Sequence, residues 1–493
     1  MIGFGIDFGT TNSVAAAFDG RELTSFVDNN GRPHPSVLWY RGSEKPIIGR
    51  KAKDKLRDFG NIPGNQFIKS IKSQIKQETE IEIFGNNYHT WQVASEIFSF
   101  LKEDAQRGYP GYPEIQEAVV TIPLYFNGQQ RKAIRQAADN ANIFVKSFIH
   151  EPFAAVIGYL FSNSNSIENL KTVKENILVF DWGGGTLDIT LVKLDSGTIS
   201  EVSNKGYPDR AGDYFDELLM QDTIDKFQQE NNIGSKGFKI EAGIESILLH
   251  DIEFAKIDLS EKDSASIEII DFYSSNGKNY FLDSEINRSH FESLISDDIE
   301  DAMGLVDRVL HEARLQTSQV NHVLLIGGTS KIPLLDRKMR DTFGAVKVQR
   351  IHNADTVIAE GAAIISYHNW QPYLVRPLCV QLADESHYVV FDTGTILKPE
   401  TAQKEVRFFS TDNRDGEGIL IVVDNLSQER YQVKEPIIKV PLSKVLRDVY
   451  EERIVTNFSI DRNVILNICA GGSVKNQTVS AEYHDLCYGL RFA

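Results

Sequence analysis

Two glycine-rich turns, each preceded by an aspartate, are the part of this sequence best suited to chemistry on phosphate. The first reads Gly5-Ile6-Asp7-Phe8-Gly9-Thr10-Thr11, and the second reads Phe180-Asp181-Trp182-Gly183-Gly184-Gly185-Thr186. Glycine lets the backbone approach an anion closely and adopt positive φ, so that free amide groups can point at one phosphate. Two matching units far apart in one chain indicate a duplicated fold, with a ligand in the cleft between the halves.

The aspartates near these turns predict a divalent cation. Asp7, Asp181 and Asp188 would oppose a phosphate, which is unfavourable unless a hard cation lies between them. Mg²⁺ keeps several waters and binds phosphate oxygens, so we expect the three aspartates to hold it through water. The sequence contains neither a GxxxxGK[ST] phosphate loop nor a GxGxxG dinucleotide motif. One such turn alone is usually an ordinary hairpin, but the matching pair favours a nucleotide site.

Composition narrows the class of protein. The chain has 493 residues, 41% of them hydrophobic and 25% charged, which is typical of a globular protein with at least two domains. Its net charge of −17 disfavours nucleic acid and anionic membranes as partners. Three cysteines without a CxxC pair, together with an N-terminus unlike a signal peptide, favour a reducing cytoplasm. No apolar run is long enough to span a membrane.

The elements that must position these turns change character along the chain. Residues 1–368 alternate apolar strands with amphipathic helices, which predicts an α/β domain. A helix over 127–143 is expected to be capped by Asn127. Residues 369–377 contain two prolines and are predicted to be a linker, and 378–493 a β-sandwich with a short helix at 443–452. The expected strands of this sandwich are Tyr388–Phe391, Glu405–Phe409, Ile419–Val423, Ile437–Val440, Val455–Ile460 and Val464–Ile468.

Six ordered blocks of this sequence resemble the signature blocks of the seventy-kilodalton heat-shock chaperone family. They are Gly5–Ser13, Val120–Arg131, Glu151-Pro152, Asp181–Asp188, Glu253–Ser260 and Ile326–Pro333. The resemblance covers the whole α/β region and continues less clearly into the β-region. It implies an actin-like ATPase built from two ribonuclease-H-like halves, followed by a β-sandwich that binds substrate. It also implies ATP, ADP and Mg²⁺ as ligands and slow ATP hydrolysis as the activity.

By this resemblance, individual residues acquire expected roles. Lys69 would stabilise charge on the transferred phosphoryl group, Glu151 would orient the attacking water, and the block Pro123–Arg131 would relay the nucleotide state to the surface. The expected catalytic residues are Lys69, Glu151, Asp181, Asp7 and Thr186. The expected nucleotide contacts are Gly9, Thr10, Thr11, Asn12, Gly183, Gly184, Gly185, Thr186, Gly212, Asp213, Glu253, Lys256, Ser260, Gly327, Gly328, Thr329, Lys331 and Asp355.

The same resemblance places an apolar peptide groove in the β-region, lined by Phe409, Ile419 and Ile421. Ile419 and Ile421 share one face of their strand, because side chains alternate along a strand. An ordinary sandwich core would explain these residues equally well. The implied partners are unfolded or extended polypeptides, with co-chaperones and a nucleotide-exchange factor as further candidates.

The sequence departs from the family pattern at several positions. Two other functions are also compatible with it. The paired glycines before a helix read Ala211-Gly212, Lys331 stands where an arginine is usual, and 370–377 lacks the acidic bracket of the family's linker. The residues after the sandwich are too few for the family's helical lid, so we expect a lidless protein, although a chain truncated at this point would have the same sequence. A metabolite kinase on the same actin-like fold is one alternative function, and a nucleotide-dependent scaffold or filament protein is another.

Overall fold

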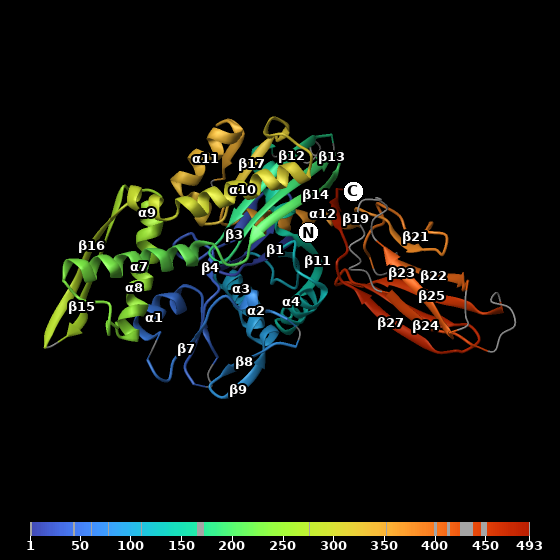
Figure 1. Ribbon diagram of the computed structural model, residues 1–493, viewed down its shortest axis with the longest axis horizontal. Helices are drawn as coiled ribbons and strands as arrows, with labels where there is room; N and C mark the ends of the chain where they lie inside the picture. The colour runs from blue at the N-terminus through green and yellow to red at the C-terminus, as the bar shows by residue number, and fades with distance from the viewer. Residues whose placement is uncertain are drawn as a thin grey trace.

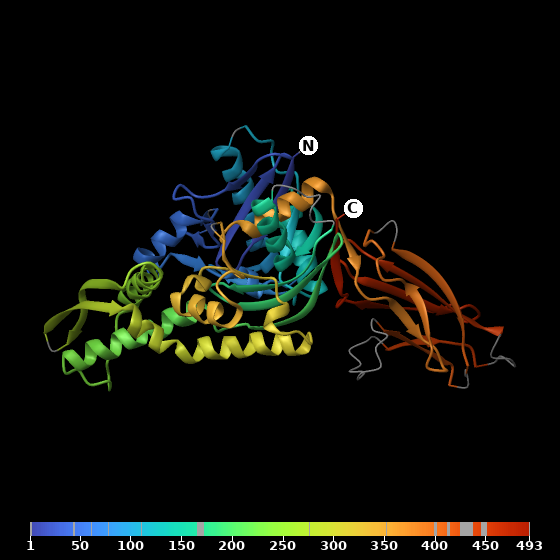
Figure 2. The ribbon, with the colours of Figure 1, turned by 90° about the horizontal axis from the view of Figure 1, so that it is seen from above.

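The computed structural model describes residues 2–42, 45–60, 62–76, 78–109, 111–164, 172–275, 277–351, 353–398, 402–411, 415–423, 437–444 and 451–492. Helices and sheets fill most of the length, and a β-rich lobe lies at one end (Figures 1 and 2). Of the expected helix at 443–452, residues 445–450 lie outside the described residues. Among the described helices, none combines the length and apolar character needed to cross a membrane.

The two large sheets of the first 374 residues repeat one arrangement of strands. The first sheet runs β11-β10-β1-β2-β3, and the second contains the matching run β18-β17-β12-β13-β14. In both, an antiparallel meander is extended by two parallel strands. The strands are β1 (Gly3–Phe8), β2 (Asn12–Phe18), β3 (Leu23–Phe26), β4 (His34–Pro35), β10 (Glu117–Ile122), β11 (Phe144–His150), β12 (Lys174–Trp182), β13 (Leu187–Asp195), β14 (Thr198–Tyr207), β17 (His322–Ile326) and β18 (Val348–Arg350). This repetition confirms the predicted duplicated α/β fold.

Helices and small sheets surround this pair of sheets. Around the first sheet lie α1 (Arg50–Phe59), α2 (Ile71–Gln74), α3 (Thr90–Gly108) and α4 (Gly128–Asn140), with β5 (Leu38–Tyr40), β6 (Ile47–Ile48), β7 (Gln66–Ile68), β8 (Glu80–Ile83) and β9 (Asn86–His89). The later helices are α5 (Glu151–Ser164), α7 (Gly212–Glu230), α8 (Ala242–Leu259), α9 (Arg288–Leu294), α10 (Ser296–Glu312), α11 (Pro333–Phe343) and α12 (Val357–His368), and β15 (Ser264–Ser275) pairs with β16 (Lys278–Asn287). The predicted cap is confirmed, because the Asn127 side chain accepts hydrogen bonds from the amides of Gln129 and Gln130.

Two helices, α5 and α12, hold the two sheets together through small residues. A side chain on Gly5 would overlap the backbone of α12, and a side chain on Gly361 would overlap the carbonyl oxygen of Ala154 in α5. The backbones therefore lie in direct contact, and the surrounding side chains form one apolar cluster shared by strands of both sheets. This close contact fixes the position of one glycine turn relative to the other.

The β-rich lobe, here called the β-domain, consists of two facing sheets whose order is β21-β20-β23-β24 and β22-β25-β26-β27. Apolar side chains from both sheets form its core. The strands are β20 (Leu378–Gln381), β21 (His387–Phe391), β22 (Gln403–Phe409), β23 (Glu417–Val423), β24 (Ile437–Pro441), β25 (Arg453–Ile460), β26 (Leu466–Gly472) and β27 (Thr478–Tyr483). This arrangement confirms the predicted all-β sandwich.

The region between the two parts differs from the expected linker. Gln371–Leu374 forms strand β19, and β28 (Tyr488–Arg491) lies between β14 and β19 in the second sheet. The two prolines suggested a linker rather than a strand. Pro372 is nevertheless compatible with β19, because β19 is an edge strand in which the missing amide hydrogen is not required. We therefore propose that the β-domain ends between β27 and β28, and not at residue 493.

The helix contact at Gly361 can be tested by adding a single methyl group. We expect Gly361→Ala to lower the free energy of unfolding by about 3 kcal/mol, because the methyl group must displace the backbone of α5. Gly304→Ala in α10 is the matched control. Nothing lies within 4 Å of its added carbon, so higher helix propensity should leave it as stable as the wild type or more so. Equal denaturant midpoints for both variants would contradict the proposed contact.

Candidate functional site

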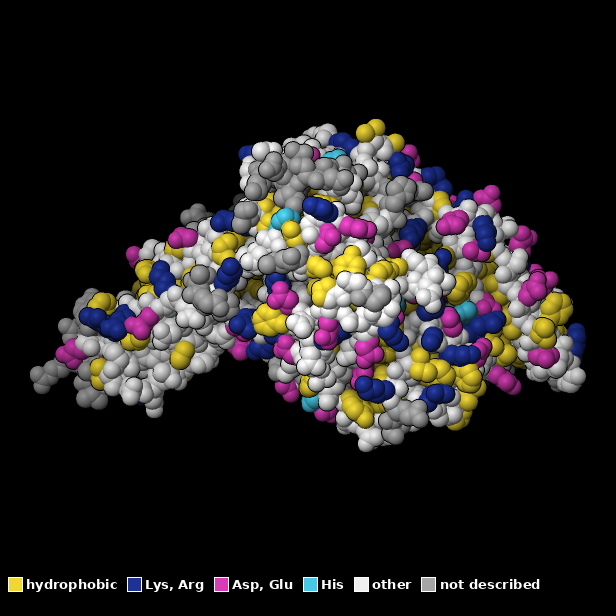
Figure 3. All heavy atoms as spheres, turned by 180° about the vertical axis from the view of Figure 1, so that it is seen from behind, with side chains coloured by type: hydrophobic (Ala, Val, Ile, Leu, Met, Phe, Trp, Pro, Cys, Tyr) yellow, Lys and Arg dark blue, Asp and Glu magenta, His cyan; other side chains and the backbone are white. Residues whose placement is uncertain are grey.

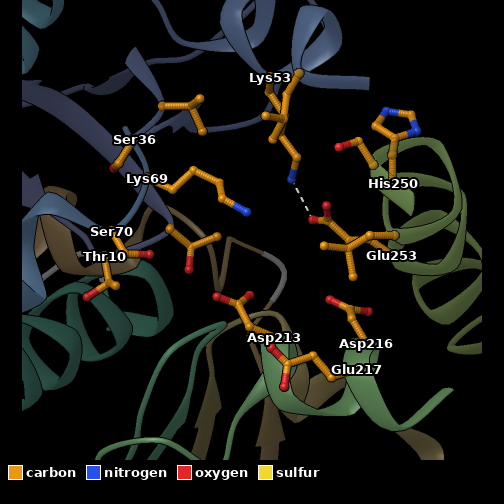
Figure 4. Close-up of a pocket in the computed structure, with 15 residues that line it drawn as sticks. Thr10, Ser36, Lys53, Lys69, Ser70, Asp213, Asp216, Glu217, His250 and Glu253 are labelled. Carbon is orange, nitrogen blue, oxygen red and sulfur yellow. Dashed lines mark hydrogen bonds and ion pairs between the residues drawn. The ribbon is translucent and has the colours of Figure 1, made fainter. Parts of the chain in front are cut away.

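A cleft opens between the two halves of the first 374 residues, and polar side chains from both halves line it (Figure 4). Thr10, Lys53 and Lys69 enter it from the first half, and Asp213 and Glu253 enter it from the second. The basic groups therefore lie mainly on one wall and the acidic groups on the other. Across the cleft, the Lys53 Nζ and Glu253 Oε1 atoms lie 2.5 Å apart and join α1 to α8.

The two glycine turns face each other at the base of this cleft. A side chain on Gly184 would overlap the Thr11 hydroxyl and come within 3.0 Å of the Asp213 carboxylate. A side chain on Gly185 would meet the Thr10 methyl group at 3.1 Å. The Thr11 hydroxyl is buried and has no hydrogen-bond partner among the described atoms. A buried donor without a partner, beside two glycines, is what a bound anion would require.

The start of α7 and the loop after β17 fix the second turn. The amides of Gly212 and Asp213 donate to the carbonyls of Gly183 and Gly184 at 3.1 and 2.8 Å, and the Thr329 hydroxyl donates to Gly183 at 2.7 Å. Gly327 has a φ of 79°, and a side chain there would overlap the backbone of Trp182. The expected contacts Gly212, Asp213, Gly327 and Thr329 therefore gather around the second turn.

Four acidic side chains meet behind the turns, and we call them the carboxylate cluster: Asp7, Glu151, Asp181 and Asp188. Burial, followed by the charge of Glu151, raises the pKa of Asp7 to about 6 and the pKa of Asp188 to about 7. The same two causes raise the pKa of Asp181 well above its ordinary value. Asp181 and Asp188 lie opposite each other on paired strands, so their separation is set by the sheet. So much buried negative charge favours a cation at this place.

Lys72 supplies a positive charge to the carboxylate cluster, and the sequence analysis missed it. Its side chain is buried, and its Nζ atom lies 2.5 Å from Glu151 Oε1. Burial acts to lower the pKa of Lys72, but Glu151 and Asp7 reverse this effect and keep it raised. The neighbouring side chains of Ile71 and Ile75 are fully buried as well, so Lys72 lies in an apolar part of the interior.

Lys69, which we expected to act on the transferred phosphoryl group, lies apart from the carboxylate cluster. It lines the open cleft near Ser70 and Thr10, and its charge acts on Asp213. The chain reverses at Ser70, which has a φ of 55°, before α2 begins at Ile71. This left-handed residue turns the next lysine into the protein interior and leaves Lys69 in the cleft. The role expected for Lys69, to stabilise charge on the transferred phosphoryl group, stays a prediction, and Lys72 is a second basic group beside the same turns.

The residues expected around adenosine are divided between the cleft and the surface. Glu253 lines the cleft, and Lys53 lowers its pKa although burial acts in the opposite direction. Lys256 is occupied by contacts at 2.8 Å with Asp216 and 2.6 Å with the carbonyl of Gly212. Of the other expected contacts, Ser260 follows the last residue of α8, and Lys331 pairs with Asp355 at 2.7 Å, both with partly exposed side chains. Asp216 was not expected in the site, and its pairing with Lys256 could not be inferred from spacing along the chain.

In the β-domain, the expected groove residues point mainly outward. The side chains of Ile419 and Phe409 are 63% and 49% exposed, so for these two the alternative of an ordinary core is wrong. Ile421 is partly buried and lies opposite Ile437, which is also exposed. Arg453 lies over the ring of Phe409 at 5.1 Å. These apolar side chains face solvent while their neighbour Leu420 faces the core.

The sequence was also compared with family profiles and with individual known proteins. The profile of the family described as Hsp70 protein matches residues 3–482. Proteins named Chaperone protein DnaK from Thermotoga petrophila and Thermosipho melanesiensis are each 30% identical to this chain, over 363 and 362 residues. Each match covers 73% of this chain and 58% of the relative, so the chain matches less than two thirds of the relatives' length.

The buried charge of Asp188 can be tested through the pH dependence of stability. Its pKa is raised from 3.8 to about 7, so the folded protein holds the proton more tightly than the unfolded chain does. This group therefore stabilises the fold below about pH 4, and that contribution is lost as the pH rises through 7. Without nucleotide or metal, Asp188→Asn should be more stable than wild type by about 1–3 kcal/mol at pH 8 and by much less at pH 5.

Asp195→Asn, at the other end of β13, is the matched control, because Asp195 is at the surface and pairs with Lys174 and Lys193. It should gain no stability at pH 8. Urea unfolding at both pH values measures the two variants. A stability difference for Asp188→Asn that does not change with pH would contradict the burial argument.

Proposed function

The chain belongs to the Hsp70 family, and we propose from this that it is an ATP-dependent chaperone that hydrolyses ATP slowly to control its hold on extended apolar polypeptides. The single observation that carries the ATPase proposal is the pair of facing glycine turns with the carboxylate cluster and Lys72 behind them. The outward-facing isoleucines of β23 support the peptide proposal. ATPase turnover with and without an extended apolar peptide tests the two together, and peptide-stimulated turnover is the expected result.

The residues around the turns suit a nucleotide held with Mg²⁺. The unpartnered Thr11 hydroxyl and the glycines that keep side chains away from it leave a place for phosphate oxygens. Among the described residues, no group of three or more His, Cys, Asp or Glu could hold a metal by itself. We therefore propose that Asp7, Asp181 and Asp188 hold Mg²⁺ through water, and that the ion neutralises phosphate charge.

For the hydrolytic step, we propose that Glu151 and Lys72 act together. Lys72 holds the Glu151 carboxylate in one orientation through their 2.5 Å contact, and both are buried next to Asp7. An ammonium group fixed in a buried site stabilises developing negative charge without reorganisation. Glu151, at the first residue of α5, then orients the attacking water. Lys69, which lines the open cleft near Thr10, is proposed to contact the phosphates of bound nucleotide.

Other functions and partners are less well supported. A metabolite kinase or a filament protein would not require a second domain with outward-facing apolar strands, so we favour the chaperone. Figure 3 shows acidic and basic side chains intermixed over the rear face, which, with the net charge of −17, gives no reason to propose a nucleic-acid partner. We propose a cytoplasmic location because none of the three cysteines forms a disulfide. Co-chaperones and an exchange factor remain proposals from the family alone.

The division of labour between the two lysines is tested by single-turnover hydrolysis of ATP. Lys72→Ala should slow the chemical step by about 10²–10³-fold, because one preorganised charge is removed, while ATP binding persists through backbone amides. Lys69→Ala should weaken ATP binding and change the chemical step by less than about tenfold. Lys51→Ala, on the exposed side of α1, is the control and should match the wild type. Wild-type hydrolysis in the Lys72 variant would remove Lys72 from the proposed mechanism.

The peptide groove is tested by two neighbouring truncations on β23. Ile419→Ala removes an exposed side chain, so it should weaken the binding of an apolar peptide about tenfold with little change in melting temperature. Leu420→Ala removes a side chain that is 2% exposed and should cost about 2–4 kcal/mol of stability. Fluorescence anisotropy with a labelled peptide and thermal unfolding give the two readouts. If Ile419→Ala lowers stability as much as Leu420→Ala does, the outward face is not a binding surface.

A further inference from the structure

Strand β28 belongs to the sheet of the nucleotide-binding halves, although the chain reaches it only after the β-domain (Figures 1 and 2). It pairs antiparallel with β14 on one side and with all four residues of β19 on the other. The Phe492 amide donates to Gly197 at 2.8 Å, and the Val375 amide donates to Cys487 at 3.1 Å. The strand is thus held on both edges by backbone hydrogen bonds.

Leu490 and Phe492, the residue that follows β28, pack against that sheet, whereas the Tyr488 side chain joins the apolar core of the β-domain. Leu490 and Phe492 are 0% and 5% exposed and join the apolar cluster that contains α5 and α12. The Phe492 ring lies 4.7 Å from the ring of Trp370. Gly489 permits the close approach, because a side chain there would overlap the carbonyl of Ile199. Because β28 is hydrogen-bonded on both edges and its apolar side chains are buried, it is an integral strand of this sheet and not a surface contact between domains.

Tyr488, the first residue of β28, contacts His150, which directly precedes Glu151 of the proposed nucleotide site. The two rings are stacked at 4.3 Å with an angle of 27° between their planes, and both residues are buried. His150 is the last residue of β11, and the next residue, Glu151, begins α5 and belongs to the carboxylate cluster. A displacement of the His150 ring therefore acts directly on the backbone that carries Glu151.

The rings of Tyr488 and His150 interact by apolar stacking and not through a hydrogen bond or a charge. Burial, followed by the nearby Arg131 charge, lowers the pKa of His150 to about 3, so the ring is neutral at physiological pH. The Tyr488 hydroxyl and the Nδ1 atom of His150 have no hydrogen-bond partner among the described atoms. Arg131 itself is held by the carbonyls of Asn463, Val464 and His484. The ring of Tyr488, and not its hydroxyl, is thus the part that supports His150.

We propose that Tyr488 is a positioning residue for Glu151, acting through His150, so that β28 completes the ATP-hydrolysing site from outside the cleft. The proposal rests on the proposed ATPase function. It predicts that a residue encoded after the β-domain sets the rate of the chemical step without touching nucleotide. A purely structural role for Tyr488 would instead change stability and leave the chemical step alone.

The test uses the full chain and separates nucleotide affinity from the chemical step. Tyr488→Ala should slow single-turnover ATP hydrolysis about tenfold while ATP affinity stays within about twofold of wild type. Tyr488→Phe should restore the wild-type rate, because the ring contact remains. Tyr483→Ala is the matched control, because Tyr483 is a buried tyrosine in the same β-domain core cluster as Tyr488. It should leave the rate unchanged. Combining His150→Ala with Tyr488→Ala should slow hydrolysis no more than the larger single effect.

Hydrogen exchange of the amides at 148–153 in the nucleotide-free protein gives a second readout that does not depend on hydrolysis. Faster exchange in Tyr488→Ala, but not in Tyr483→Ala or Tyr488→Phe, supports the proposal. An unchanged hydrolysis rate in Tyr488→Ala, or an equal loss in Tyr483→Ala, overturns it while leaving the ATPase proposal intact. A wild-type protein that binds ATP but never hydrolyses it would overturn the proposed function, and the positioning role with it.

Discussion

The burial of four carboxyl groups around one lysine is the constraint on which the rest of this structure depends. Asp7, Asp181 and Asp188 would each lose the favourable solvation of their charge on leaving water, and their raised pKa values record that cost. The fold tolerates it because α5 and α12 lock the two sheets together through glycine contacts. The proposed Mg²⁺ ion and nucleotide would offset this cost, so the cluster that destabilises the fold would favour binding of these ligands.

The geometry of the sheets explains why these groups meet. Each half places its glycine turn at the end of a central strand, and the two halves have the same strand order. Asp7 and Asp181 therefore occupy corresponding places, while Asp188 lies on the strand that pairs with Asp181. The cross-cleft pair Lys53 and Glu253 then joins the outer ends of the two halves. Opening the cleft would require this pair to separate, whereas the base of the cleft is held by packing.

Local patterns in the sequence were sufficient to predict much of the fold and the two glycine turns. The Asn127 cap, the β-domain strands and the duplicated glycine turns each depend on residues close together in the chain. Lys72 was missed because its burial depends on a left-handed turn at Ser70, which no spacing rule revealed. The strand β28 was not predicted, and its residues were included in the β-sandwich, because its partners β14 and β19 lie more than 100 residues before it. Pairing over such distances depends on the packing of the whole protein and leaves no local signal.

The position of β28 also has a consequence for the order of assembly. A ribosome makes β14 and β19 long before β28, with the entire β-domain between them. Until β28 emerges, the edge of β14 and the apolar cluster beside α5 lack the strand that covers them. The second sheet can therefore reach its final form only after the β-domain has been synthesised, and late strand insertion makes the nascent chain vulnerable to pairing with other chains. A protein proposed to hold extended polypeptides must thus pass through a stage in which one of its own strand edges is exposed.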